Sequence, residues 1–183
     1  PIDASKIKSI AVIGENATRL QTYGGDSSRV KAFYEIAPLA GILNRIGTNV
    51  NVTYAEGYRK GGDAALAERA VAAAKAADVV IYVGGINHDI GYDSEGGDKK
   101  GLEMPYGQVE LLQKLTKANP RLVAVLVGGS PMEMDAWLGH FPPLFFFKRA
   151  MISESFSHLK NTLIITLLSI TMRSKVWLAI KAI

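Results

Sequence analysis

Short apolar runs alternate with amphipathic stretches along most of the chain. Four of the apolar runs are rich in β-branched residues and are bounded by glycine or polar residues, as strands buried on both faces of a parallel sheet usually are. The predicted strands are residues 7–14, 49–57, 79–83 and 122–127. The second of them alternates more between apolar and polar positions, so we expect it to occupy a more exposed position.

Amphipathic stretches separate these strands. Residues 35–46 place leucine and isoleucine side chains at helical spacing, and Gly47 follows as a C-terminal stop. A second helix is predicted from an N-cap at Asp63 to Ala77. Its apolar stripe consists mainly of small alanines, so this helix should lie close against a sheet. The stripe positions of the two helices are Leu39, Ile42, Leu43 and Ile46, and Leu66, Ala70, Ala73 and Ala77.

A third helix is predicted between Pro105 and Asn119-Pro120. Proline suits the first turn of a helix because its missing N–H has no partner there in any case. The buried face of this helix should hold Leu111, Leu112, Leu115 and Ala118. Strands and helices thus alternate as in βαβ units. This alternation predicts an α/β fold, a three-layer α/β/α sandwich around a mostly parallel sheet.

The alternating pattern ends after Trp137, a residue that we expect to pack at a helix end. Residues 144–147 are a candidate fifth strand. Residues 163–172 are apolar but reach only about half of the ~20 residues needed to cross a bilayer. They fit either an interfacial helix or a poorly ordered tail, and we favour the tail. We therefore divide the chain into a domain of residues 1–143 and an atypical basic, hydrophobic tail of residues 144–183.

The basic character of the chain belongs to this tail. Residues 1–143 contain 15 Lys and Arg against 16 Asp and Glu, whereas residues 144–183 contain 6 against 1. No basic stripe with interleaved aromatic residues lies in the organised part, so we expect no nucleic-acid partner. The chain has no cysteine, which excludes a disulfide framework and thiolate metal sites. It begins at Pro1 without methionine or a signal peptide, so we expect a fragment or a processed product.

The stretch GGINHDIGYDSEGGDKKGLEMP, residues 84–105, is the strongest candidate for chemistry. A connection of this length between a strand and a helix is far longer than usual, and such loops are often functional. It follows a predicted buried strand and so starts at the carboxyl edge, where open α/β sheets bind ligands. Glu95 and its charged neighbours are therefore the candidate site. Residues 21–30, QTYGGDSSRV, form a second polar loop beyond a strand, either a phosphate cradle or a surface turn at Gly25-Asp26.

These segments together resemble the C-terminal α/β sandwich domain of family 3 glycoside hydrolases, the β-glucosidase and β-xylosidase type. Several separate motifs in the same order carry the resemblance, which covers the chain as far as Trp137. They are IAVIGENA, YGGDSSRV, PLAGI, EGYRKGGD, AVAAAKAADVVIYVGG, SEGGDKKGLEMPYGQVELLQKL and VAVLVGGSPMEMDAW.

The resemblance implies one part of a retaining β-glycosidase. In that family an N-terminal TIM barrel supplies an aspartate nucleophile, and the sandwich domain supplies the acid/base glutamate, which Glu95 matches. A retaining enzyme needs a second carboxyl about 5–5.5 Å from the nucleophile. A neighbouring carboxylate raises the pKa of such an acid and keeps it protonated. The implied partners are the barrel and a β-linked oligosaccharide or glycoside substrate. No cofactor is implied, and the family favours a periplasmic or secreted location.

The resemblance also implies substrate contacts near the mouth of the active site. It places Asp98 and Lys99 beside Glu95, and members of the family often have arginine at the position of Lys99. Lysine keeps the charge but loses the fork of parallel donors, so a bidentate contact is not expected. The loop residues that match a leaving-group contact are Tyr23, Gly25, Asp26 and Ser27.

Less specialised interpretations of the same residues remain open. Glu95 is alternatively a solvated loop carboxylate, and Asp98 alternatively braces the loop. His88 with Asp89 and Asp93 matches no calcium-loop or zinc spacing, so we expect no metal. His140 and His158 have no identifiable serine or acid partner, so a nucleophilic triad is not expected.

Two functions follow for the chain as a whole. The preferred one is the accessory half of a β-glucosidase-like enzyme, inactive without the barrel that carries the nucleophile. The alternative is a non-catalytic carbohydrate-binding or interaction module.

The tail departs from the family, which continues with a strand, a tryptophan-tyrosine-proline-glycine stretch and a glycine-rich segment. We hypothesise that residues 144–183 are an out-of-frame translation, because their composition changes abruptly. Translation of the coding DNA in its other frames should then recover a glycine-rich continuation. If neither of the other frames encodes a glycine-rich continuation, the tail is instead an unrelated C-terminal segment.

Overall fold

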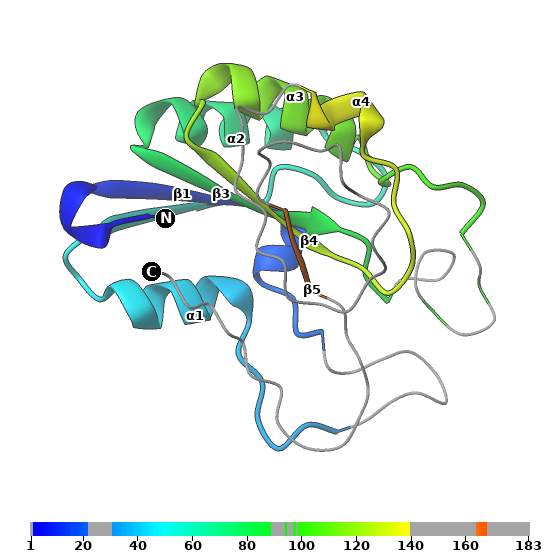
Figure 1. Ribbon diagram of the computed structural model, residues 1–183, viewed down its shortest axis with the longest axis horizontal. Coiled ribbons are helices and arrows are strands. Elements are labelled where there is room, and N and C mark those ends of the chain that lie inside the picture. Colours follow the sequence, from blue (N-terminus) through cyan, green and yellow to red (C-terminus); the bar gives the residue numbers. More distant parts are fainter. Residues whose placement is uncertain are drawn as a thin grey trace, which may run out of the picture.

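A computed structural model describes residues 2–21, 31–88, 94, 97, 99–139 and 164–167 of the chain. These residues form a parallel sheet of five strands with helices on both faces (Figure 1). In chain order the elements are η1 (Ala4–Lys6), β1 (Ser9–Ile13), η2 (Glu15–Ala17), α1 (Pro38–Ile46), β2 (Asn51–Ala55), α2 (Ala64–Ala76), β3 (Val79–Gly85), α3 (Gln108–Ala118), β4 (Leu122–Val127), α4 (Asp135–Leu138) and β5 (Ile164–Leu167). The strand order is β2-β1-β3-β4-β5. The predicted α/β fold is therefore confirmed.

Both faces of the sheet are buried, which gives the molecule three layers. Helices α2, α3 and α4 cover one face, and α1 covers the other (Figure 1). Within β1, Ala11 and Ile13 belong to the core cluster that contains residues of α2 and α3. Ile10 and Val12 belong to the opposite cluster, which contains Ile42 of α1. Because successive strand residues point to opposite faces, a strand covered on both sides has an uninterrupted apolar sequence.

Strand β2 occupies one edge of the sheet and pairs only with β1 within the described chain. None of its five residues is buried, and Tyr54 is 37% exposed. This agrees with the more polar alternation of its sequence.

Helix α2 forms as predicted. The Asp63 side chain accepts a hydrogen bond from the Ala65 N–H at 3.0 Å and caps the first turn. Ala70 and Ala74 are fully buried against the sheet. Their small side chains let the helix axis approach the strands closely.

Two helices begin later than the sequence predicts. Helix α1 begins at Pro38 rather than at residue 35, and its Leu43 is 44% exposed rather than buried. Helix α3 begins at Gln108 rather than at Pro105. Tyr106 and Gly107 have φ values of 65° and 70°. Right-handed helix requires negative φ, so the chain turns once more before α3 starts.

The tail contributes the fifth strand of the sheet. Ile164–Leu167 pairs in parallel with β4, from Ala124 opposite Ile164 to Val127 opposite Leu167. An interfacial helix is therefore wrong for these four residues. The strand predicted at residues 144–147 lies outside the described part of the chain. No helix in that described part has both the length and the apolar character needed to cross a bilayer.

Asp78 joins β1 to β3 at the amino edge of the sheet. Its carboxylate accepts hydrogen bonds from the Lys8 N–H at 2.7 Å and the Ser9 N–H at 3.0 Å. In return, the Asp78 N–H donates to the Ser9 hydroxyl at 2.9 Å. The hydrogen bond from Lys8, followed by the one from Ser9, holds the pKa of Asp78 below its ordinary value of 3.8.

We predict that Asp78→Asn lowers the melting temperature at pH 7 and that the difference from the wild type shrinks at pH 3 and below. A carboxylate whose folded-state pKa is depressed contributes stability above its unfolded pKa of 3.8. It loses that contribution as the pH falls through the folded-state pKa. Thermal unfolding followed by circular dichroism at both pH values measures this. Glu68→Gln, at an exposed carboxylate on α2, is the control, and an Asp78→Asn difference independent of pH contradicts the prediction.

Candidate functional site

The direction of chain progression reverses between β1 and β3. From β1 the chain moves outward to β2, and from β3 it moves the other way to β4. In open parallel sheets, ligands bind at the carboxyl ends of the strands that flank such a reversal. The two loops predicted to hold site residues leave the sheet at this position. Residues 22–30 follow β1 and η2, and residues 86–107 follow β3.

Gln108 closes the long loop after β3. Its side chain is fully buried, and its Nε2 donates to the Gly85 carbonyl at 2.7 Å. Its Oε1 accepts from the Gly85 N–H at 2.8 Å and from the Tyr82 hydroxyl at 2.6 Å. Gly85 is the last residue of β3 and Gln108 the first of α3. One amide therefore joins the two ends of the loop that contains Glu95.

Burial keeps the Tyr82 hydroxyl protonated in its hydrogen bond to Gln108. Tyr82 is fully buried, and the resulting desolvation raises its pKa well above the ordinary value of 10. The phenol therefore keeps its proton and remains a hydrogen-bond donor to Gln108.

Asn16 connects the exit of β1 to the exit of β3. Its side chain is completely buried, and its Nδ2 donates to the carbonyls of Gly84 at 3.1 Å and Ile86 at 3.3 Å. Farther along the same two segments, Nε2 of His88 lies 3.2 Å from the Gln21 carbonyl oxygen. The described starting points of both predicted site loops are thus in contact.

Two glycines allow close backbone contacts between neighbouring strands at this edge of the sheet. A Cβ atom at Gly85, where φ is 101°, would lie 2.2 Å from the Val127 carbonyl oxygen. A Cβ atom at Gly14, where φ is 126°, would lie 1.9 Å from the Val83 carbonyl oxygen. Both backbones also have positive φ, which other residues adopt only at a cost. Glycine is therefore required at the end of β3 and directly after β1.

Of the predicted site residues, Lys99 is the one whose surroundings are described. Its Nζ donates to the Pro131 carbonyl, in the connection between β4 and α4. Beside it, the Glu133 N–H donates to the Leu102 carbonyl at 2.7 Å. These bonds attach the returning half of the loop to the neighbouring connection. The predicted residues outside the described part of the chain are Tyr23, Gly25, Asp26, Ser27, Glu95 and Asp98.

The residues on either side of Glu95-Gly96 are described. The Gly97 N–H donates to the Ser94 carbonyl at 3.4 Å, and the two residues form an isolated antiparallel bridge. Ser94 and Gly97 are therefore held close to each other on either side of Glu95-Gly96.

Several buried polar atoms at the carboxyl edge have no hydrogen-bond partner. Buried side-chain polar atoms are usually paired, so such atoms indicate unused hydrogen-bonding capacity. All those found in the described part of the chain lie in connections that follow β1, β3 or β4. They are Glu15 Oε2, Asn16 Oδ1, Gln21 Nε2, Ser94 Oγ and Ser130 Oγ.

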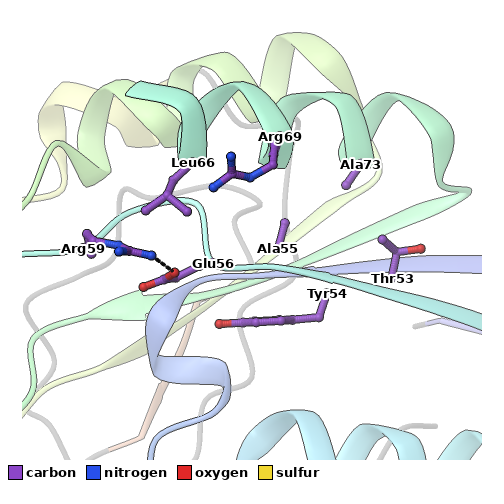
Figure 2. Close-up of a pocket in the computed structure, with 8 residues that line it drawn as sticks. All are labelled: Thr53, Tyr54, Ala55, Glu56, Arg59, Leu66, Arg69 and Ala73. Atoms are coloured by element: carbon purple, nitrogen blue, oxygen red, sulfur yellow. Dashed lines mark hydrogen bonds and ion pairs between the residues drawn. The ribbon is translucent and has the colours of Figure 1, made fainter. Parts of the chain in front are cut away.

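A separate pocket of about 400 Å³ lies between β2 and α2 (Figure 2). Arg59 on its rim forms an ion pair with Glu56 at 2.6 Å, and Arg69 points into it from α2. The pocket lies at the outer edge of the sheet, on the side of β1 away from β3. Its lining includes Ala55 at the end of β2 and Glu56 and Arg59 just beyond it, so one end of the pocket lies at the carboxyl edge of the sheet, beside β2 rather than between β1 and β3. Among the described residues, no three His, Asp or Glu side chains gather in a group able to hold a metal ion.

Sequence reasoning missed Gln108 and Asn16. Gln108 stands at the start of an amphipathic helix and Asn16 in a turn after a strand, where polar residues are common. Their hydrogen bonds span 23 to 70 residues of sequence, so no local periodicity reveals them. The one feature of the sequence that could have indicated Gln108 is its position, directly after a long loop and at the start of an amphipathic helix.

Comparison with known proteins finds similarity to one family. The model of the glycosyl hydrolase family 3 C-terminal domain matches residues 1–143. A β-glucosidase of Bacteroides ovatus is 40% identical over 157 residues, which cover 79% of this chain and 21% of the relative. A β-xylosidase of Formosa agariphila is 30% identical over 154 residues, which cover 79% of this chain and 20% of the relative. The chain thus spans about a fifth of the length of these relatives.

A solved structure has the same fold. The crystal structure of a family 3 β-glucosidase of Bifidobacterium adolescentis superposes with a TM-score of 0.63 at 35% identity. The match covers 75% of this chain and 20% of that structure.

We predict that Gln108→Leu destabilises the fold by roughly 2–5 kcal/mol, because it leaves the Gly85 N–H, the Gly85 carbonyl and the Tyr82 hydroxyl buried without partners. Urea unfolding measures the change. Gln113→Leu on the same helix removes one exposed hydrogen bond to the Ala136 carbonyl and should cost about 1 kcal/mol or less. Equal effects of the two substitutions contradict a special role for Gln108.

Proposed function

The chain belongs to the glycosyl hydrolase family 3 C-terminal domain family, and we propose that it supplies Glu95 as the general acid/base of a retaining β-glycosidase. The strongest support is that the segments from which the two predicted site loops begin are in contact with each other. His88 lies against Gln21, and Asn16 holds Gly84 and Ile86, at the sheet edge where α/β folds bind ligands.

The proposed reaction requires a second domain. A retaining mechanism needs a nucleophilic carboxylate about 5–5.5 Å from the acid/base carboxyl. The nucleophile attacks the anomeric carbon while Glu95 protonates the departing glycosidic oxygen. Glu95, now ionised, then takes a proton from water, whose oxygen attacks the anomeric carbon and releases the nucleophile. In this proposal an N-terminal barrel carries the nucleophile, so the chain alone does not hydrolyse glycosides.

The anchoring of the loop suits an acid that acts across a domain boundary. Gln108 fixes the two ends of the loop, and the Lys99 and Leu102 contacts fix its returning half. Between these anchors, residues 89–98 include three glycines, a residue type that adopts backbone conformations which other residues reach only at a cost. A catalytic group must be held to within a fraction of an ångström, and a loop anchored at both ends restricts its position more than a free loop does.

The proposed substrates are β-linked glucosides or xylosides. The two relatives, a β-glucosidase and a β-xylosidase, support this class and differ in the sugar. We propose that Tyr23, Gly25, Asp26 and Ser27 contact the leaving-group sugar, together with Asp98 and Lys99. The Lys99 ammonium has three N–H donors and uses one on the Pro131 carbonyl, so two remain for a sugar hydroxyl.

The test uses the chain fused behind the N-terminal domain of the Bacteroides ovatus β-glucosidase. We predict that Glu95→Ala lowers kcat/KM about 10²–10⁴-fold on an alkyl β-glucoside, whose leaving group needs protonation. The loss should be much smaller on a dinitrophenyl β-glucoside, whose leaving group departs without an acid. Azide should accelerate the variant on the dinitrophenyl substrate, because azide attacks the glycosyl intermediate without needing a base.

Glu103→Ala is the matched control, because Glu103 is an exposed carboxylate of the same loop. It should leave both activities unchanged. Equal losses of Glu95→Ala on both substrates contradict the acid role. A non-catalytic sugar-binding module, the alternative function, predicts that the fusion binds glycosides but that Glu95→Ala changes no rate.

A further inference from the structure

Strand β2 lies at an edge of the sheet and, in the described part of the chain, pairs only with β1. Its first residue, Asn51, donates its N–H to the Lys8 carbonyl at 2.8 Å. The residues of a strand direct their N–H and carbonyl groups alternately to one side and to the other. Val52 and Tyr54 therefore point theirs away from β1, and both residues offer an N–H and a carbonyl to a further strand.

The sequence of β2 lacks the usual protection of an edge. Edge strands commonly resist pairing with other chains through lysine, proline or a β-bulge. Strand β2 has the sequence NVTYA, which contains no charged residue and no proline. Its register with β1 is continuous from Asn51 to Ala55, so it has no bulge. The whole length of the strand is therefore suited to pairing with another extended chain.

The pocket between β2 and α2 lies beside this edge (Figure 2). Thr53 and Ala55 line it from the strand, and Leu66 and Ala73 line it from the helix. Side chains of an added strand alternate between the two faces of the sheet, as those of β2 do. Every second side chain of an added strand would therefore lie on the face that contains the pocket. The volume of about 400 Å³ is ample for such side chains.

Arg69 determines which side chain suits the pocket. Its guanidinium points into the pocket from α2 and has no hydrogen bond or ion pair with the described residues. The other charged residues of the lining, Glu56 and Arg59, compensate each other in an ion pair at 2.6 Å. The remaining positive charge favours an acidic side chain. A second copy paired through β2 would instead bring two Arg69 side chains to one interface, and such like-charge contacts are unfavourable.

We propose that the edge of β2 and the adjoining pocket bind an extended peptide segment of another protein that carries an aspartate or glutamate. The peptide backbone pairs with Val52 and Tyr54, and the acidic side chain binds Arg69. In this mode of recognition, main-chain hydrogen bonds provide affinity and pockets for alternate side chains provide specificity. The site does not include Glu95, so this inference is independent of the proposed reaction.

Capped pentapeptides of alternating threonine and valine test the site on the 183-residue chain. Their central residue is replaced by glutamate, glutamine or lysine. Titration followed by NMR should shift the amide signals of Val52 and Tyr54. The glutamate peptide should bind about three- to tenfold more tightly than the glutamine peptide, and the lysine peptide most weakly. Methylation of the amide nitrogens along one edge of the glutamate peptide should abolish binding, whereas methylation along the other edge should not.

A matched pair of variants tests the role of the cation. Arg69→Gln should abolish the preference for glutamate and keep the wild-type melting temperature, because the Arg69 side chain is exposed. Arg45→Gln, at an exposed arginine of α1 on the opposite face of the sheet, should leave the preference unchanged.

Three results overturn the proposal. The first is equal binding of the three peptides to the wild type, or binding of none of them. The second is a preference for glutamate that survives in Arg69→Gln. The third is a shift of the Val52 and Tyr54 signals that depends on protein concentration without any peptide, because a second copy then occupies the edge.

Discussion

The hydrogen bonds that two buried amides make to the end of β3 are the constraint on which the candidate site depends. Asn16 and Gln108 bind the three consecutive carbonyls of Gly84, Gly85 and Ile86. A strand normally loses its regular partners where it leaves the sheet, and its exit direction is then poorly defined. Here the direction is fixed from both sides, by a residue after β1 and by the first residue of α3. A loop of 22 residues therefore starts and ends at one defined point.

The same arrangement explains why the sheet carries the site at one edge. Strands β1 and β3 are buried on both faces, so side chains along their lengths pack in the core and cannot contact a ligand. Only the connections at the strand ends have freedom to carry polar groups, as is usual in α/β folds. In this chain the connections after β1 and β3 hold predicted site residues, unpaired polar atoms and exposed apolar side chains together. One edge of the molecule thus has the properties expected of an incomplete active site.

The sequence predicted the architecture because each element depends on local patterns. Apolar runs located β1 to β4, and Asp63 and Asn119-Pro120 marked helix ends that the structure confirms. The start of α3 was wrong because the positive φ values of Tyr106 and Gly107 are set by the path of the loop and not by helix propensity. The site was less predictable, since Asn16 and Gln108 act through contacts between distant residues. The family resemblance suggested Glu95, whose proposed role depends on a carboxylate of another domain.

Pre-steady-state kinetics of the Glu95→Ala fusion with a dinitrophenyl β-glucoside tests the acid/base role most directly. The first step needs no acid with this leaving group, whereas release of the sugar from the nucleophile needs a base. The variant should therefore give a burst of dinitrophenol close to one equivalent of enzyme, followed by slow turnover, and the glycosyl group should be attached to the N-terminal domain. A variant that turns over at the wild-type rate without a burst would contradict the role of Glu95.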